Sequence, residues 1–456
     1  MAPPAPGMIG RDEALERLRA AADEARAGMP QAVLVTGEAG IGRTRFVAEA
    51  SQRLAADGWL VATGQAVRQD GGGAPFLPFV QVLGEIVAAT DPARRASILG
   101  PVRDDVQRLL PDPRPGDVAR PPSGADDDAG PLRQARLFEG VLDVGERVAA
   151  IQPLCVVIED IQWLDRSSAD LLRFFVGQAR TGRLLLVATA RTGHTESDAE
   201  SLLVDLVRPS TSWLQLHRLS TDETRELVAD RLGQSLAATE IDDLVHRSDG
   251  VPMIALELAD AHARGEATSP SVEAILQYRL DALPRLAADV VRAAAILAPT
   301  IDEVRLAVAL DQPVETVEPA VRTAIDADIL TIATRAPAGL AFRHELLREL
   351  AERSLLPAQR RRLHRAIAAA AERDPTETPL PATERARHWA AAGEPAQALR
   401  AAATAQVDAA AVAAHDAVLR DGDLALLLWP HVPAADRVGI DRVAIERLSA
   451  DAAMCL

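Results

Sequence analysis

The first half of the chain alternates between short apolar runs and stretches in which apolar residues recur at helical spacing. Five apolar runs predict buried strands, at 31–36, 59–63, 153–158, 183–189 and 213–216. Five amphipathic stretches predict helices, at 12–27, 44–56, 76–89, 132–149 and 167–179. Strands that are largely apolar and alternate with helices are typical of a parallel sheet covered on both faces, so we predict an α/β domain over residues 1–218.

A stretch rich in proline, glycine and aspartate, residues 111–131, predicts a linker-like insert within this domain, because the strand pattern resumes after it. Helical spacing prevails from residue 219 onward. We predict a helical domain over 219–282, a mainly helical domain with one strand pair over 283–373, and a helical segment over 374–456 with one repeat-like helix pair. The expected fold class is therefore α/β followed by all-α.

Composition and charge narrow the class of protein. Apolar residues make up 48% and charged residues 25%, as in folded globular chains, and the net charge of −17 disfavours non-specific binding to nucleic acid. The chain has no lysine and no asparagine, so all 49 basic residues are arginine. No apolar run is long enough to span a bilayer and the N-terminus lacks the apolar core of a signal peptide, so we expect a cytoplasmic protein.

A glycine-rich turn, GEAGIGRT at 37–44, follows the first apolar run and precedes a helix. It matches the phosphate-binding pattern G-x-x-x-x-G-K-[ST] except that Arg43 stands in the lysine position. The glycines would let backbone N–H groups surround phosphate oxygens, the helix would add its dipole, and Thr44 would place a hydroxyl on Mg²⁺. The alternative is a strand–helix turn that binds nothing.

Two acids, Glu159 and Asp160, follow the apolar run LCVVI. An acidic pair there is usually a solvated turn, but downstream of a phosphate loop it is typical of the strand that holds the Mg²⁺ shell and polarises water. The residues leave open which acid does which. Arg191, at the end of the next strand, would contact the γ-phosphate, although a solvated strand-end arginine fits the spacing equally well. The candidate catalytic residues are Glu159, Asp160 and Arg191, and the candidate metal ligands are Thr44 and Asp160.

These motifs belong to an ordered series that covers residues 9 to about 411. They are IGR at 9–11, GEAGIGRTR at 37–45, PFLPF at 75–79, IEDIQWLDRSS at 158–168, LLVATAR at 185–191, SDGVP at 248–252, FRHELLRE at 342–349 and LPAQRRRLHRAIA at 356–368. In this respect the chain resembles the regulatory ATPase module of the large LuxR-type transcriptional regulators, including relatives of the maltose-regulon activator. That family belongs to the signal-transduction ATPases with numerous domains, a branch of the AAA+-like P-loop NTPases.

The resemblance implies a P-loop NTPase sheet, a helical lid over 219–282 and a winged-helix domain over 283–373, with ATP or ADP and Mg²⁺ as cofactors. Ile9, Gly10 and Arg11 would line the adenine pocket, and Pro252 would close over the base. His344 would sense ADP versus ATP at the phosphates, whereas from the residues alone it reads as a packed core histidine. The phosphates would be contacted by Gly37, Glu38, Ala39, Gly40, Ile41, Gly42, Arg43, Thr44 and Arg45.

The chain departs from this family in two places. Arg43 keeps the charge of the usual lysine but is bulkier and planar, so nucleotide binding would persist while ATP hydrolysis would be slow or absent. Residues 429–456 show no helix-turn-helix, so we expect no direct DNA binding by this chain, and a fragment, a degenerate copy and a stand-alone switch all stay open.

The function expected from the sequence is a nucleotide-gated switch in transcriptional control that changes conformation with the nucleotide it holds. One alternative is a non-hydrolysing scaffold that acts through its helical C-terminal surface. Another is the ATPase-like module that accompanies class III nucleotide cyclases. An inducer or protein partner is implied by the switch, but no residue pattern identifies it, and no membrane partner is expected.

Overall fold

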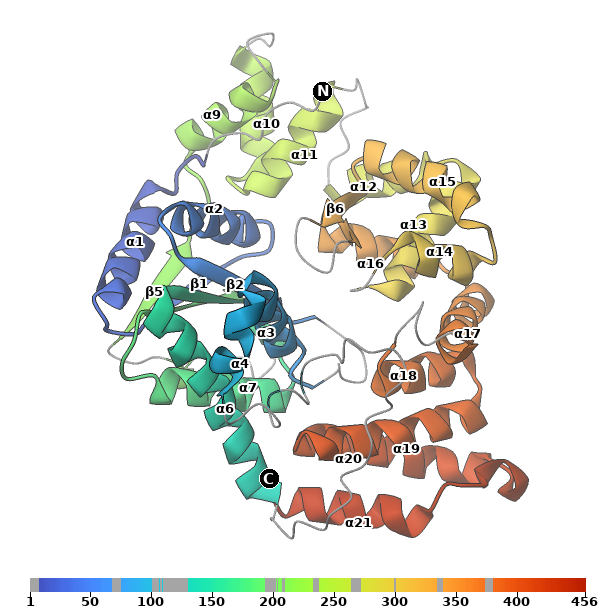
Figure 1. Ribbon diagram of the computed structural model, residues 1–456. Coiled ribbons are helices and arrows are strands. Elements are labelled where there is room, and N and C mark those ends of the chain that lie inside the picture. Colours follow the sequence, from blue (N-terminus) through green and yellow to red (C-terminus); the bar gives the residue numbers. More distant parts are fainter. Residues whose placement is uncertain are drawn as a thin grey trace. The chain divides into compact units, whose positions relative to one another are not determined.

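The computed structural model describes residues 8–67, 75–100, 106, 109, 130–192, 202, 204–206, 210–232, 238–263, 272–298, 301–333, 339–373 and 380–456. These residues form two compact units. The first contains the main sheet and the helices up to α11, and the second contains the helices from α12 onward with the hairpin β6–β7 (Figure 1). Within the described ranges, no helix is long and apolar enough to cross a membrane. The predicted insert 111–131 lies outside these ranges, apart from its last two residues, which begin α6.

The first unit is built on a parallel sheet with the strand order β2-β3-β4-β1-β5. The strands are β1 (Gln31–Gly37), β2 (Leu60–Gln65), β3 (Leu154–Glu159), β4 (Leu184–Arg191) and β5 (Thr211–Leu216). All five start or end within two residues of the predicted runs, and the predicted parallel sheet is confirmed. Because β4 lies between β1 and β3, the strand that ends in Arg191 separates the glycine-rich turn from the acidic pair.

Helices cover both faces of this sheet (Figure 1). They are α1 (Asp12–Arg26), α2 (Arg43–Ala56), α3 (Leu77–Ala89), α4 (Pro92–Leu99), α6 (Gly130–Ile151) and α7 (Arg166–Gln178). One face packs against α1 and α2 through alternate strand residues such as Val33, Val157 and Val187. On the other face, helices α3, α6 and α7 pack beside the sheet, and the rings of Phe138 and Phe174 lie 5.6 Å apart there. This is the arrangement expected of an α/β sheet buried on both sides.

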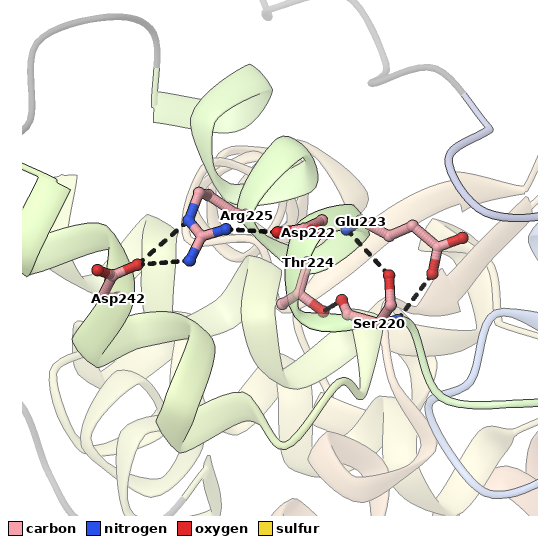
Figure 2. Close-up of polar contacts among 6 residues, drawn as sticks. All are labelled: Ser220, Asp222, Glu223, Thr224, Arg225 and Asp242. Atoms are coloured by element: carbon pink, nitrogen blue, oxygen red, sulfur yellow. Dashed lines mark hydrogen bonds and ion pairs between the residues drawn. The ribbon is translucent and has the colours of Figure 1, made fainter.

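Three helices follow β5 and pack on one another: α9 (Thr221–Leu232), α10 (Ala238–Ser248) and α11 (Pro252–Ala263). A capping box starts α9, because the N–H of Ser220 donates to Glu223 Oε2 (2.7 Å) and the N–H of Glu223 donates to Ser220 Oγ (3.2 Å) (Figure 2). Arg225 then forms ion pairs with Asp222, at 2.7 Å, and with Asp242 of α10, at 2.9 Å (Figure 2). These contacts fix the first turn of α9 and its place beside α10.

The second unit begins with five helices and an antiparallel hairpin. They are α12 (Val272–Asp281), α13 (Arg285–Leu297), α14 (Glu303–Leu310), α15 (Val314–Asp326), β6 (Leu330–Ala333), β7 (Gly339–Phe342) and α16 (Glu345–Arg353). Ile301 adds an isolated bridge to Leu340. The predicted strand pair is therefore confirmed. Leu276 and Leu280 of α12 belong to the core of this second unit, whereas the sequence-based division grouped that helix with the preceding ones.

The chain continues as helices that each pack on the one before: α17 (Pro357–Arg373), α18 (Ala382–Ala392), α19 (Pro395–Ala411), α20 (His415–Leu428) and α21 (Arg442–Ala453). Buried alanines such as Ala386, Ala398 and Ala425 allow the helices to approach closely. The buried amide of Gln406 donates to the carbonyl oxygens of Val418 (3.3 Å) and Ile445 (3.1 Å). The predicted repeat-like pair corresponds to α18 and α19, and Gln406 joins that pair to α20 and to the residues of α21.

Candidate phosphate-binding site

The glycine-rich turn connects the end of β1 to the start of α2. Gly40 and Gly42 have φ angles of 76° and 97°, in the left-handed region that glycine adopts without steric cost. Gly42 is the N-cap of α2, where no described side chain caps the helix, and a Cβ added to it would meet no described atom within 4 Å. A turn of this shape at a helix N-terminus presents backbone N–H groups to an anion.

Arg43 and Asp160 form an ion pair beside this turn, with 3.3 Å between Nη2 and Oδ1. Asp160 Oδ1 also accepts a hydrogen bond from Gln162 Nε2 at 3.0 Å. The backbone of Asp160 is in the left-handed region (φ 56°), and its N–H donates to Thr189 Oγ1 at 2.8 Å. Asp160 is thus held by β4 and by the 3₁₀ helix η2 (Ile161–Trp163) in the position where it meets Arg43.

The Arg43 guanidinium is a buried cation. Burial lowers the pKa of Arg43 from its ordinary value, Asp160 and Glu159 raise it, and the nearby Arg191 lowers it further. An arginine nevertheless stays charged in a protein. Among the described residues, Arg43 Nη1 and Arg191 Nε are buried N–H groups without a hydrogen-bond acceptor. Leaving a buried donor unsatisfied costs about 1–3 kcal/mol, so these two groups favour a bound anion.

Arg191 lies next to the turn because β4 pairs with β1. Arg191 is opposite Gly37 in the strand register, and the N–H of the following residue, Thr192, donates to the Gly37 carbonyl at 3.0 Å. The N–H of Arg191 donates to Gln162 Oε1 at 3.1 Å, so one glutamine amide joins Arg191 to Asp160. The carboxyl ends of β1, β3 and β4 therefore bring together the turn, the acidic pair and Arg191, at the sheet edge where α/β proteins bind ligands.

The two acids of the pair occupy different environments. Glu159 is the last residue of β3 and is only 1% exposed, whereas the Asp160 side chain is 23% exposed and is the one paired with Arg43. Mg²⁺ prefers oxygen ligands in a regular octahedron. Asp160 Oδ1 already accepts two donors, one of them a cation, and Thr44 is exposed at the start of α2. In this arrangement Oδ1 of Asp160 is occupied by these two donors, and the role of Asp160 as a Mg²⁺ ligand stays a prediction.

The residues predicted to line the adenine pocket lie between the turn and the start of α9. Arg11 is 8% exposed and donates from Nη2 to the Ile41 carbonyl at 3.2 Å. Gly10 has a left-handed φ of 67°, which favours glycine, and a Cβ there would lie 2.6 Å from Glu223 Oε1, so a side chain would push the Glu223 carboxylate away. Hydrogen bonds from Ser220 lower the pKa of Glu223, and Arg11 contributes to the same shift. The carboxylate of the capping box thus also faces Gly10 and Arg11.

The start of α11 is attached to the same turn. Pro252 is the first residue of α11, and the N–H of Met253 donates to the Gly40 carbonyl at 3.1 Å. A Cβ on Gly40 would lie 3.1 Å from Met253 Cβ, so the turn and the helix are in close contact. On the exposed side, Arg218 pairs with Glu38 of the turn at 2.7 Å and with Asp249 before α11. A movement of the turn would therefore be transmitted directly to α11.

The first unit brings together most of the predicted site residues, although their roles stay predictions. His344 lies in the second unit as the half-buried N-cap residue of α16, and its predicted role also stays a prediction. Several residues around the turn were not predicted, namely Gln162, Thr189, Arg218, Glu223 and Met253. Gln162 and Thr189 stand inside the motifs IEDIQWLDRSS and LLVATAR, and Glu223 ends the capping-box pattern that begins at Ser220, so these three could have been found. Arg218 and Met253 carry no such signal in the sequence.

Comparisons with known proteins agree with this geometry. Residues 8–187 match the family described as AAA ATPase domain. The chain is 28% identical over 391 residues to an uncharacterized protein from Rhizobium meliloti (strain 1021). The match covers 79% of this chain and 36% of that protein. The chain thus spans little more than a third of that relative's length.

A solved structure extends the comparison to the fold of the whole chain. It is the Signal Transduction ATPase with Numerous Domains (STAND) protein with a tetratricopeptide repeat sensor from Pyrococcus horikoshii, with 13% identity and a TM-score of 0.53. The match covers 99% of this chain and 62% of that protein. At this identity the likeness concerns the fold alone. The chain therefore contains an AAA ATPase domain over residues 8–187, and its fold is similar to that of a STAND protein.

Proposed function

We propose that this chain is a regulatory switch that binds ATP or ADP, as the ATPase module of a LuxR-type transcriptional regulator. The observation that carries the proposal is the pair of buried guanidinium N–H groups, Arg43 Nη1 and Arg191 Nε, beside the left-handed glycines of the turn. Backbone N–H groups at a helix N-terminus and two cations without an acceptor are the chemistry that recognises a phosphate chain. The match to the AAA ATPase domain supports a nucleotide as the carrier of that phosphate.

In this proposal the bound nucleotide acts on the lid helices through a main-chain hydrogen bond. The phosphates would be bound by residues 37–45, and Gly40 of this turn accepts the hydrogen bond from the N–H of Met253 in α11. The adenine would lie towards Gly10, Arg11 and Pro252, which surround the same turn. Because α11 is fixed to the turn, a change of nucleotide alters the position of the lid helices, and this movement is the signal.

Hydrolysis is expected to be slow or absent. Phosphoryl transfer depends mostly on the placement of charge at the bridging and γ-oxygens. Arg43 is held at 3.3 Å from Asp160, so its charge is shared with an acid rather than directed entirely at the phosphates. A misplacement of about 1 Å can reduce a rate by ~10²-fold. The switch would then respond to nucleotide exchange more than to turnover.

The second unit would receive the signal. The order of α13, the Ile301 bridge, α14, α15 and the hairpin β6–β7 supports the winged-helix domain implied by the resemblance, with His344 as the sensor of the phosphates. Helices α18 to α21, which pack one on the next, would form a helical surface that binds the unknown inducer or partner.

A non-hydrolysing scaffold remains a second candidate function, favoured by one observation. Arg43 and Asp160 neutralise each other without any ligand, so the site is electrostatically satisfied in part when no nucleotide is present. The test is to purify the protein, denature it and identify any released nucleotide by chromatography, followed by equilibrium dialysis with ATP and ADP. Release or saturable binding of an adenine nucleotide supports the switch. If no nucleotide is released and none binds, the scaffold is supported.

A further inference from the structure

We propose that this site binds nucleoside diphosphate without a metal ion, because the Arg43 guanidinium bridges Asp160 and the phosphates in the place where Mg²⁺ acts in other phosphate-binding loops. The inference rests on the proposed nucleotide-binding function and names its ligand more closely: a metal-free diphosphate. It follows from the positions of three side chains, Arg43, Asp160 and Gln162.

The two terminal nitrogens of Arg43 are in different situations, one paired with Asp160 and one without an acceptor among the described residues. Nη2 lies 3.3 Å from Asp160 Oδ1, and Nη1 is buried without an acceptor among the described residues. A planar guanidinium can donate to a carboxylate from one nitrogen and to a phosphate oxygen from the other at the same time. A lysine in this position has a single ammonium nitrogen, so it acts as a point charge and cannot form this fixed bridge.

One carboxylate oxygen of Asp160, a predicted metal ligand, already accepts two hydrogen bonds. Asp160 Oδ1 accepts hydrogen bonds from Arg43 and from Gln162, at 3.3 and 3.0 Å. Gln162 is 6% exposed, and its Oε1 accepts the N–H of Arg191 at 3.1 Å, so its amide is held at both ends. A Mg²⁺ ion on Oδ1 of Asp160 would have to displace these donors and build its own octahedron of oxygens. The protein supplies the positive charge that the ion would bring.

The number of cations suits a diphosphate. Arg43 and Arg191 each place a buried N–H without an acceptor at this end of the sheet, and Asp160 takes part of the charge of Arg43. A diphosphate carries less negative charge than a triphosphate, so two guanidinium groups and the backbone N–H groups of the turn offset a larger share of it. Dependence on the metal should therefore be weaker for ADP than for ATP.

The experiment is titration calorimetry with ADP in buffer with Mg²⁺ and in buffer with EDTA, on the wild type, Arg43→Lys and Arg53→Lys. Arg53 lies on the same helix and pairs with Glu49 at 2.8 Å, so its replacement is a matched control. Removal of the metal should change the wild-type and Arg53→Lys Kd by less than about 3-fold, and should weaken Arg43→Lys by about 10-fold or more, a difference of ~1.4 kcal/mol. Thermal melting verifies that each variant is folded.

The wild-type measurement decides the question even if Arg43→Lys does not fold. Wild-type binding that weakens about 10-fold or more in EDTA would overturn the metal-free site while leaving the nucleotide switch intact. Equal metal dependence of the wild type and a folded Arg43→Lys would also overturn the role of the guanidinium. Absence of ADP binding in both buffers would refute the proposed function itself, and the inference with it.

Discussion

The ion pair between Arg43 and Asp160 predicts an asymmetric response to removal of its two partners. Asp160→Ala leaves a buried guanidinium without its anion and deprives Gln162 of an acceptor. Removing one partner of a fully buried pair costs about 3–5 kcal/mol. Because the two side chains are 10% and 23% exposed, we expect Asp160→Ala to cost ~2–3 kcal/mol. Arg43→Met leaves a carboxylate that Gln162 and water can reach, so its cost should be ~1 kcal/mol.

The double variant tests the cause of this difference. If Asp160→Ala is costly because Arg43 is left uncompensated, then adding Arg43→Met should recover ~1 kcal/mol or more, a clear departure from additivity. Urea unfolding should be followed by hydrogen exchange in peptides of β1 and α2, because the chain has two units and its whole-chain transition need not be two-state. Equal losses in the two single variants, with additive loss in the double, would refute the reasoning.

Four further predictions follow from the same features. Arg43→Lys should raise phosphate release from ATP more than it raises ATP affinity; a wild type that already releases phosphate as fast would show arginine to be a competent substitute. His344→Ala should make residues 283–356 more sensitive to protease in the presence of ADP, and identical digestion of both proteins would leave His344 as a packing residue. Burial, with Arg387 and Arg360, lowers the pKa of His364 to about 4, and burial lowers the pKa of His388 well below its usual value. The free energy of unfolding should therefore fall as the pH drops from ~6.5 towards ~4, by up to ~3 kcal/mol for His364. A free energy of unfolding that does not change over this pH range would contradict the prediction. The chain should form no sequence-selective DNA complex in a gel-shift assay, and a salt-resistant one would refute that expectation.

The sequence predicts the sheet well because its signal is local. A strand buried on both faces needs an unbroken apolar run, and the runs at 31–36 and 153–158 correspond to β1 and β3 with a shift of one residue. The glycine-rich turn was equally readable, since glycine adopts the left-handed region at its positions 40 and 42 without steric cost. The order of motifs along the chain then predicted that the turn, the acidic pair and Arg191 belong to one nucleotide site.

The partners of the site residues could not be predicted, because they come from distant parts of the chain. Arg43 and Asp160 are separated by 117 positions, and Arg218 and Glu38 by 180. The sequence left open which of the two acids holds the metal shell and which serves as base. It also gave no sign that Asp160, with its left-handed backbone, pairs with Arg43. The core that α12 joins could not be predicted for a similar reason, since a short amphipathic helix does not reveal which neighbouring core it packs on.

The central claim is that Arg43 and Arg191 complete a nucleotide phosphate site with the glycine-rich turn. The most direct test compares the ADP affinity of the wild type with that of the double variant Arg43→Ala/Arg191→Ala. Calorimetry should give one-site binding in the wild type and a loss of at least about 100-fold in the folded double variant, since each charged hydrogen bond is worth ~1.5–3 kcal/mol. An unchanged Kd in that variant, or no binding by the wild type, would contradict the claim.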